Sequence, residues 1–385
     1  KNSATATAKA TSTTKKTTKY SLPTGNITKK APAARKKAGS KEEEQSSHHH
    51  QQQQHLPFSG AGHRPSRSSR GVGDPSLNPH ASPRRPLGRM IEPSDGGRST
   101  GDSLQRQGPT GPPSVRRTFQ DGEYEGQIVS DGRRHGYGVM QFVNGDKYVG
   151  WWNDDVMDGM GRMKYSDGDK YEGNFKGGCF NGQGTYQYAS GNTYEGEWRN
   201  DQCDGHGVFT DSRGSRYAGN WRQDTMEGRG RYVDALGNQY EGNFRAGKFD
   251  GHGILRYTDG DVYDGDFHAG MKDGSGNLQS SDGSLYKGMW RDDRRHGWGA
   301  MYDVMGGLYE GEFLDNVRHG RGIYRWPEGD VDCSMYEDDR RKGEGVAWSA
   351  DRKKSWQLMS GQVDAEASQS GAALIAEKLG FPVPK

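Results

Sequence analysis

A tyrosine recurs at a fixed interval through most of this 385-residue chain. Its successive copies lie 23 residues apart, except that the first precedes the second by 24. Self-similarity at a fixed period is the mark of a repeat architecture, in which each period is one structural unit that becomes stable only when it stacks on its neighbours. The series consists of Tyr124, Tyr148, Tyr171, Tyr194, Tyr217, Tyr240, Tyr263, Tyr286 and Tyr309.

Each tyrosine opens a phrase with the alternation of a β-strand. In one copy, Tyr194, Gly196 and Trp198 occupy alternate positions. Because successive side chains of a strand point to opposite faces, the two rings and the glycine share one face. Glu195 and Glu197 then lie on the other face. Each unit is therefore predicted to begin with a strand that has one aromatic-and-glycine face and one polar face.

The second half of each unit reads Gly-x-Gly followed by alternating apolar residues, as in Gly251, Gly253, Leu255 and Tyr257. This pattern predicts a second strand, so that each unit is an antiparallel hairpin. We expect about five polar residues between the two strands, and Asp-Gly or Asn-Gly turns between units. A lone hairpin is marginal in water, so the units must stack. The predicted fold is all-β, an elongated single-layer antiparallel ribbon or solenoid of about ten hairpins.

The composition divides the chain into three parts: residues 1–118, 119–354 and 355–385. The first part is low in complexity and is predicted to be a disordered tail. The second is the repeat array, which ends in a degenerate unit over residues 332–354. The third is predicted to close the array.

The closing segment contains a helical pattern over residues 368–379. Its apolar stripe is predicted to consist of Leu374, Ile375 and Leu379, with Gly380 as the stop signal. We expect this short helix to cap the ribbon by covering its end.

Charge separates the tail from the array. Residues 1–118 carry 21 Lys and Arg against 7 Asp and Glu, a net charge of +14, which leaves −12 for the remainder. Three interpretations of the tail stay open: a solvated tail, attraction to acidic membrane lipids, and nucleic-acid binding or organelle targeting. Its densest basic cluster, residues 35–37, has only three charges and falls short of the four to eight typical of membrane recognition. No specific nucleic acid is expected as a partner.

The repeats show no pattern that indicates catalysis, a cofactor or a metal. Gly-x-Gly lies inside a strand in every unit, whereas a phosphate-binding loop lies between a strand and a helix. Carboxylates that follow the opening tyrosine form a regular stripe, as expected for a solvent-facing side. The candidates interpreted as structural are His135, His206, His252, His296 and His319, the low-complexity tract from His48 to His55, the carboxylates Glu172, Glu195, Glu241 and Glu310, and the thiols Cys179 and Cys203.

The phrase Tyr-x-Gly-x-Trp/Phe, followed by Gly-x-Gly at a 23-residue period, resembles the MORN family (membrane occupation and recognition nexus repeats). The resemblance covers residues 124 to about 354, roughly 60% of the chain. It implies a twisted β-ribbon with a shallow aromatic groove, and scaffold roles in cytoskeletal, ciliary or membrane-junction assemblies. Some members are said to bind acidic phospholipids or to dimerise through the repeats. Arrays of this kind also occur as accessory regions of phosphatidylinositol phosphate kinases.

The aromatic face is the feature with functional content. Its rings either pack only on each other, or leave a groove that receives a partner, because one sheet layer has no second layer to cover it. We expect a non-catalytic, cytoplasmic scaffold, associated with the cytoskeleton or a membrane, that binds a protein helix or a second copy. The alternatives are a peripheral binder of phosphoinositides and an accessory region of a lipid kinase. The predicted partner groove consists of Tyr194, Trp198, Tyr217, Trp221, Tyr240, Phe244, Tyr263 and Phe267.

Overall fold

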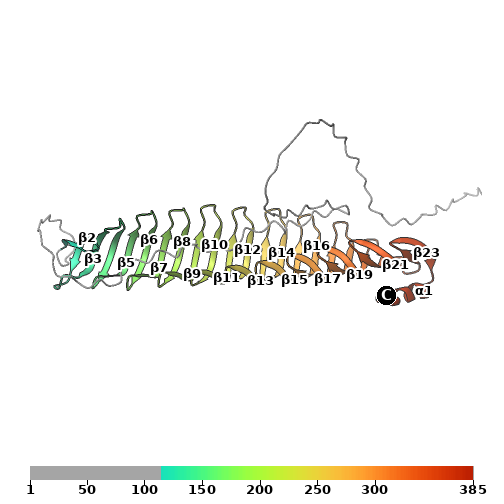
Figure 1. Cartoon of the computed structure of the whole chain (residues 1–385). Helices are drawn as coiled ribbons and strands as arrows, with labels where there is room; N and C mark the ends of the chain where they lie inside the picture. The colour runs from blue at the N-terminus through green and yellow to red at the C-terminus, as the bar shows by residue number, and fades with distance from the viewer. Residues whose placement is uncertain (1–113, 385) are drawn as a thin grey trace, which may run out of the picture.

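A computed structural model describes residues 114–384, which form one sheet of 23 strands and one helix. Each strand pairs antiparallel with the strand before it and the strand after it in the chain. The result is an elongated single layer with the strands side by side (Figure 1). The predicted all-β ribbon is therefore confirmed, whereas the predicted disorder of residues 1–118 falls almost wholly outside the described residues.

The strands of the first half of the sheet are β1 (Val115–Phe119), β2 (Gly122–Ile128), β3 (Arg134–Phe142), β4 (Lys147–Asn153), β5 (Val156–Lys164), β6 (Lys170–Lys176), β7 (Cys179–Gln187), β8 (Thr193–Arg199), β9 (Gln202–Thr210), β10 (Arg216–Arg222), β11 (Thr225–Val233) and β12 (Gln239–Arg245). The second half contains β13 (Lys248–Arg256), β14 (Val262–His268), β15 (Met271–Gln279), β16 (Leu285–Arg291), β17 (Arg294–Tyr302), β18 (Leu308–Leu314), β19 (Val317–Arg325), β20 (Val331–Glu337), β21 (Arg340–Trp348), β22 (Ser355–Met359) and β23 (Gln362–Ala367). The helix α1 spans Gln369–Lys378.

The alternation read from the sequence sets the two faces of the sheet. In β8 the tyrosine, the glycine and the tryptophan are buried, and the residues between them are exposed or half-buried. We call the face that carries these rings and glycines the inner face, and the opposite one the outer face. Glycines pair with glycines across successive strands, as Gly196 does with Gly207 and Gly207 with Gly219. This row of glycines gives each tyrosine ring room to lie against the backbone.

The two kinds of connection are the reverse of what we predicted. Within a unit, β8 and β9 are joined by two residues, Asn200 and Asp201, both at positive φ (50° and 67°). That conformation matches the right-handed twist of paired strands, so no longer loop is needed. The five-residue connection lies instead between units, where residues 211–215 form a turn that ends near Gly214, at φ +94°. Our prediction of five residues within the hairpin was wrong because the second strand begins before its Gly-x-Gly.

The ends of the sheet extend beyond the repeat pattern. At the N-terminal end, β1 pairs with β2, so the boundary drawn from composition at residue 118 falls inside a strand. At the C-terminal end, β22 and β23 add two strands within the part that we predicted to close the array. The sheet thus begins and ends on strands that have no tyrosine phrase.

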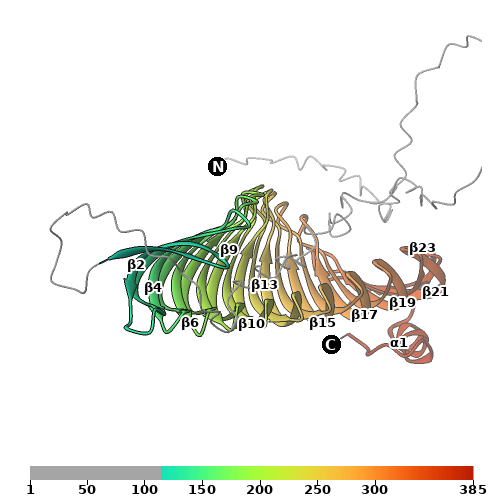
Figure 2. The ribbon, with the colours of Figure 1, turned by 60° about the vertical axis from the view of Figure 1, so that its left-hand side comes forward.

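Helix α1 forms where the sequence predicts it, with Ser368 as its N-cap; the Ser368 side chain accepts a hydrogen bond from the Gly371 N–H. It packs beside β21 and β22 on the outer face of the sheet (Figure 2). Its buried residues are Ala372 and Ala376, whereas Leu374 is exposed. The predicted apolar stripe was therefore wrong in part: two small residues let the helix lie close to the sheet, where a leucine would hold it away.

Candidate interaction surface

The eight rings of the predicted groove form a continuous stripe on the inner face. They contact one another edge to face across units: the Tyr194 and Trp221 centroids are 5.3 Å apart, and those of Tyr217 and Phe244 are 4.8 Å apart. Each ring is at most 4% exposed. A partner would therefore meet little of these rings unless they moved, and the stripe forms the core of the ribbon. Those buried rings are Tyr194, Trp198, Tyr217, Trp221, Tyr240, Phe244, Tyr263 and Phe267.

The polar atoms of these rings are satisfied within the sheet. The Tyr194 hydroxyl donates to the carbonyl oxygen of Glu197 at 2.9 Å, and every opening tyrosine from Tyr124 to Tyr309 makes the same bond three residues on. The Trp221 indole N–H donates to the carbonyl oxygen of Gly207 at 3.2 Å. Burial raises the pKa of these phenols, and that of Tyr124 reaches about 12. These phenols therefore help to hold the sheet together.

One core position of each unit carries a feature that we missed in the sequence. Units in the middle of the array have an apolar residue here, such as Met157 or Phe249, whereas the first unit has Arg134. The later units carry cations here as well. Like Arg134, whose guanidinium carbon is 4.6 Å from the Trp152 ring centroid, these cations lie over aromatic rings. Such cation–π contacts compensate in part for the lost hydration of the cation. The cations are Arg134, Lys272, Arg295, Arg318 and Arg341, all in the same 23-residue register, which was the signal in the sequence.

Lys272 is the most enclosed of these cations. Only 1% of its surface is exposed, and its Nζ lies 5.2–5.4 Å from the centroids of Tyr257, Tyr263 and Trp290. Burial lowers the pKa of Lys272 to about 8, against the opposing attraction of Asp293 and other carboxylates. Burial also raises the pKa of Asp293 above its usual value. Both shifts favour the neutral forms of the two groups.

Aspartates along the two long rims of the ribbon hold neighbouring units together. On one rim, the Cys203 N–H donates to the Asp224 carboxylate at 2.8 Å, 21 residues on. On the other rim, the Ala189 N–H donates to Asp169 at 2.8 Å, 20 residues back. The pattern recurs along the array, with Asn316 taking the aspartate's place in a later unit. Many aspartates of the array therefore accept hydrogen bonds from backbone N–H groups of neighbouring units.

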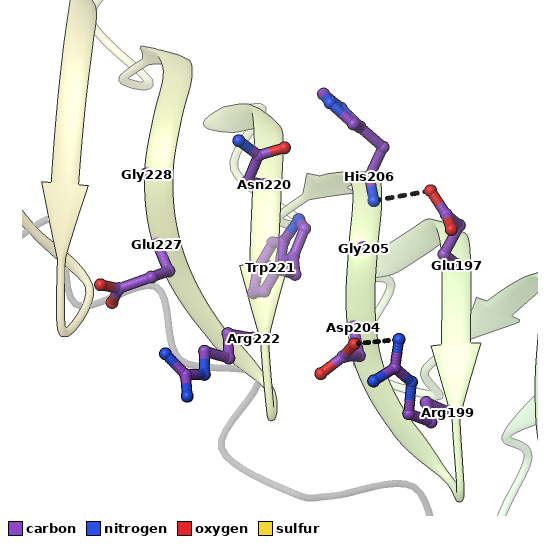
Figure 3. Close-up of a pocket in the computed structure, with 10 residues that line it drawn as sticks. All are labelled: Glu197, Arg199, Asp204, Gly205, His206, Asn220, Trp221, Arg222, Glu227 and Gly228. Atoms are coloured by element: carbon purple, nitrogen blue, oxygen red, sulfur yellow. Dashed lines mark hydrogen bonds and ion pairs between the residues drawn. The ribbon is translucent and has the colours of Figure 1, made fainter.

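A hollow of about 450 Å³ opens on the array between β8 and β11. Four of its residues already contact one another in pairs: the backbone N–H of His206 donates to Glu197 at 2.9 Å, and Arg199 lies 3.2 Å from Asp204 (Figure 3). The opening of the hollow is wide. The lining consists of Glu197, Arg199, Asp204, Gly205, His206, Asn220, Trp221, Arg222, Glu227 and Gly228.

The outer face carries large apolar side chains that contact solvent. Tyr137 and Trp151 are paired across β3 and β4, with ring centroids 5.9 Å apart, and are 50% and 49% exposed. Met160 on β5 is 53% exposed, and the Trp151 side chain lies over Gly159, the residue before Met160. Other units have polar residues at most of these positions. Exposed aromatic and methionine side chains are typical of binding surfaces.

Further along the outer face, Trp298 is 52% exposed and occupies the position of Tyr137 seven units later. Its cross-strand neighbour is Glu312, where Tyr137 has a tryptophan. On its other side, the side chain of Met289, 44% exposed, lies over Gly297, the residue before Trp298. This second site has one aromatic ring, so the N-terminal cluster of Tyr137, Trp151 and Met160 is the larger of the two apolar sites.

The remaining candidate residues lie apart from one another. In the described part of the chain, no three His, Cys, Asp or Glu side chains come together as a metal site would require. Glu172 pairs with Arg162 at 2.8 Å, as expected for a solvent-facing stripe. Cys203 is buried in the core, and burial raises the pKa of its thiol well above the usual value, so it is a poor nucleophile. No helix in residues 114–384 has the length and apolar character needed to cross a membrane.

The fold and the surface define the class of protein. It is an elongated repeat protein with an aromatic core and an outer face that is mostly polar and carries a few exposed aromatic residues. Nine consecutive matches to the MORN repeat family model cover residues 124–147, 148–170, 171–193, 194–216, 217–238, 240–262, 263–285, 286–307 and 309–331. The chain belongs to the MORN-repeat family, as the tyrosine phrase indicated. A search of curated proteins finds no match.

Two solved domains are among the structures with a similar trace. The TCP10 domain of Danio rerio CPAP in complex with a STIL peptide is 13% identical, with a TM-score of 0.34, over 59% of this chain and 94% of that one. The Drosophila melanogaster SAS-4 TCP domain in complex with a proline-rich motif of Ana2 is 16% identical, with a TM-score of 0.27, over 48% of this chain and 97% of that one. At these scores the similarity carries no argument about function.

Proposed function

We propose that this protein is a non-catalytic scaffold that binds other proteins through the outer face of its repeat array. The inner face is filled by its own rings, so the array has a continuous core along its length. The outer face is accessible and carries half-exposed aromatic residues in positions that are polar in most other units. That placement is the observation that supports the proposal, because aromatic residues are enriched in the binding sites of proteins.

The proposal moves the binding surface from the inner rings to the outer face. Trp198 and Trp221 are buried and donate to backbone carbonyl oxygens, so their removal would damage the sheet as well as any groove. Binding through the inner rings stays a second prediction, which requires the rings to move. MORN repeats are associated with membrane and cytoskeletal settings, and we place the protein at such a site in the cytoplasm.

The absence of catalysis is part of the proposal. The Gly-x-Gly elements lie within strands, as Gly205 and Gly207 do in β9, where no helix follows to face a phosphate. In the hollow between β8 and β11, Arg199 pairs with Asp204, and Glu197 accepts from the backbone N–H of His206. We expect the purified protein to show neither ATP binding nor phosphorylation of phosphatidylinositol phosphates.

Affinity capture with the full chain and with a chain lacking residues 1–113 tests the proposal. The deletion stops at 113 because β1 begins at Val115. We expect the truncated chain to retain the protein partners of the full chain. Sedimentation with vesicles that contain acidic phospholipids, run in parallel, should show binding only when the basic tail is present. Loss of all protein partners on truncation would assign function to the tail and contradict the proposal.

A further inference from the structure

The sheet has an open edge at each end of the ribbon. Among the described strands, β1 pairs only with β2, and β23 pairs only with β22. The residues of β23 from Gln362 to Glu366 are all exposed. The two edge strands lie at opposite ends of the elongated sheet (Figure 1). An edge strand presents N–H and C=O groups that can pair with a strand of another molecule.

The side chains of the two edge strands carry opposite charges. β23 contains Asp364 and Glu366, and neither forms an ion pair with another residue of the described range. β1 contains Arg116 and Arg117. Arg116 pairs with Glu123 at 2.8 Å, whereas Arg117 donates to a carbonyl oxygen and has no carboxylate partner within residues 114–384. The C-terminal edge is therefore acidic and the N-terminal edge basic.

Charged residues at a sheet edge ordinarily keep it from pairing with another molecule. Two copies joined through their β23 strands would bring two Asp364 and two Glu366 side chains together, and two copies joined through β1 would do the same with arginines. Like charges on paired strands are destabilising. A β23 edge beside a β1 edge instead places acidic side chains next to basic ones. The charges therefore oppose both symmetric arrangements and favour the head-to-tail one.

The two charged side chains Arg117 and Glu366 lie on the same face of the sheet. Arg117 is directly opposite Tyr124, which belongs to the inner face. At the other end, the row of facing residues that starts at Tyr309 ends at Glu366. Residues that face each other across paired strands share one side of the sheet. Both charges therefore belong to the inner face, one at each end of the ribbon.

A second copy that continues the ribbon with its inner face on the same side places its β1 beside β23. The two strands then run parallel, because both are odd-numbered strands of a sheet in which the direction alternates. Val115 and Val363 are the next inner-face positions toward the N-terminus of each strand, since a bulge at Asp364 accounts for the extra residue of β23. Parallel pairing thus sets Glu366 beside Arg117 of the next copy. The same register sets the two valines side by side.

We infer that this protein assembles end to end, with the β23 edge of one copy paired to the β1 edge of the next through Glu366 and Arg117. Because the contact joins opposite ends, every added copy leaves a new free end, and the assembly is an open chain of copies. One pair of strands is a small interface, so the association is weak and decreases with salt. The contact uses the ends of the ribbon and is independent of the outer face to which we assign partner binding.

Sedimentation velocity of the full chain tests the inference. At about 50 mM salt the mean sedimentation coefficient should rise with protein concentration, and at about 0.5 M salt this rise should be lost. Arg117→Glu makes both ends acidic and Glu366→Arg makes both ends basic, so each variant alone should stay monomeric. An equal mixture of the two should assemble again, because each acidic end then meets a basic one. The matched control is Glu195→Arg, at an exposed position far from both ends, which should assemble as the wild type does.

Several outcomes would overturn the inference. They are a wild type that stays monomeric at low salt, a single variant that assembles as well as the wild type, and a mixture that fails to recover assembly. A species that stops at the dimer would indicate a two-fold contact, and loss of assembly on removal of residues 1–113 would assign it to the tail. Circular dichroism and thermal unfolding of each variant show whether it is folded. Affinity capture of protein partners through the outer face is expected to be the same for both edge variants, so the scaffold proposal stands or falls separately.

Discussion

The ring of Tyr194 occupies the space that a side chain at Gly207 would fill. A Cβ at Gly207 would lie 2.3 Å from the Tyr194 hydroxyl oxygen and 2.5 Å from its ring carbon Cζ. The hydroxyl is held in place by its bond to the Glu197 carbonyl oxygen. The same contact recurs in every complete unit, for example between Tyr240 and Gly253. The tyrosine and the second glycine of Gly-x-Gly therefore act as one packing element.

Gly207→Val should destabilise the array by about 1–3 kcal/mol or more, because the new side chain overlaps the Tyr194 ring and forces it to shift. Glu195→Ala, on the exposed outer face of the same unit, should cost less than about 1 kcal/mol. Chemical denaturation of both variants measures the difference. Equal effects would mean that the two faces are assigned wrongly.

Lys272→Met should reveal the cost of the buried charge. The folded pKa of about 8 lies below the usual value of 10.5, so between these values the unfolded chain binds more protons than the folded one. The wild-type chain should therefore gain up to about 3 kcal/mol of stability as pH rises from 8 toward 10.5. The methionine variant, which matches Met226 in another unit, should lack this gain.

Denaturation of the wild type and the variant at pH 7 and pH 9.5 measures that dependence. The control is Lys248→Met, at an exposed position, which should leave the pH dependence of the wild type in place. A wild-type stability that is flat or falls over this interval, relative to Lys272→Met, would contradict a buried, charged lysine at neutral pH.

Asp224 tests the bonds between units. Asp224→Asn should be tolerated, because an asparagine oxygen can still accept from the Cys203 N–H, as Asn316 accepts from the Arg295 N–H. A glycine at position 224 adopts the positive φ of the turn without strain, but Asp224→Gly leaves the buried Cys203 N–H without its acceptor. It should cost about 1–3 kcal/mol relative to the asparagine variant. Hydrogen exchange at the Cys203 amide should increase only in the glycine variant.

Replacement of both Trp198 and Trp221 by alanine tests whether the partner binds the inner rings or the outer face. Each ring is buried and its indole N–H is bonded, so each change should cost about 3–5 kcal/mol of stability. If the inner rings form the partner groove, binding should be lost even under conditions where the variant is shown to be folded. If the outer face binds the partner, the folded fraction of the variant should retain full affinity. Circular dichroism alongside the binding assay distinguishes the two.

The sequence alone determined the strands, their order and the assignment of the two faces. The 23-residue period of tyrosine and the alternation within each phrase are local, and antiparallel neighbours in a ribbon follow from chain order. The helix at residues 369–378 was also predictable, because its capping signals are local. In contrast, the loop lengths were misjudged because the Asn200–Asp201 turn needs only two residues at positive φ.

Only the tertiary structure decided which residues are buried. Rings such as Trp221, from which we predicted a groove, cover one another across units, so a single layer closes its own core. The cation Lys272 lies in that core because rings of neighbouring units surround it. Tyr137 and Trp151 stay exposed because α1 covers the outer face only at the other end of the ribbon. Burial depends on contacts between units and with α1, and the sequence of a single repeat does not predict those contacts.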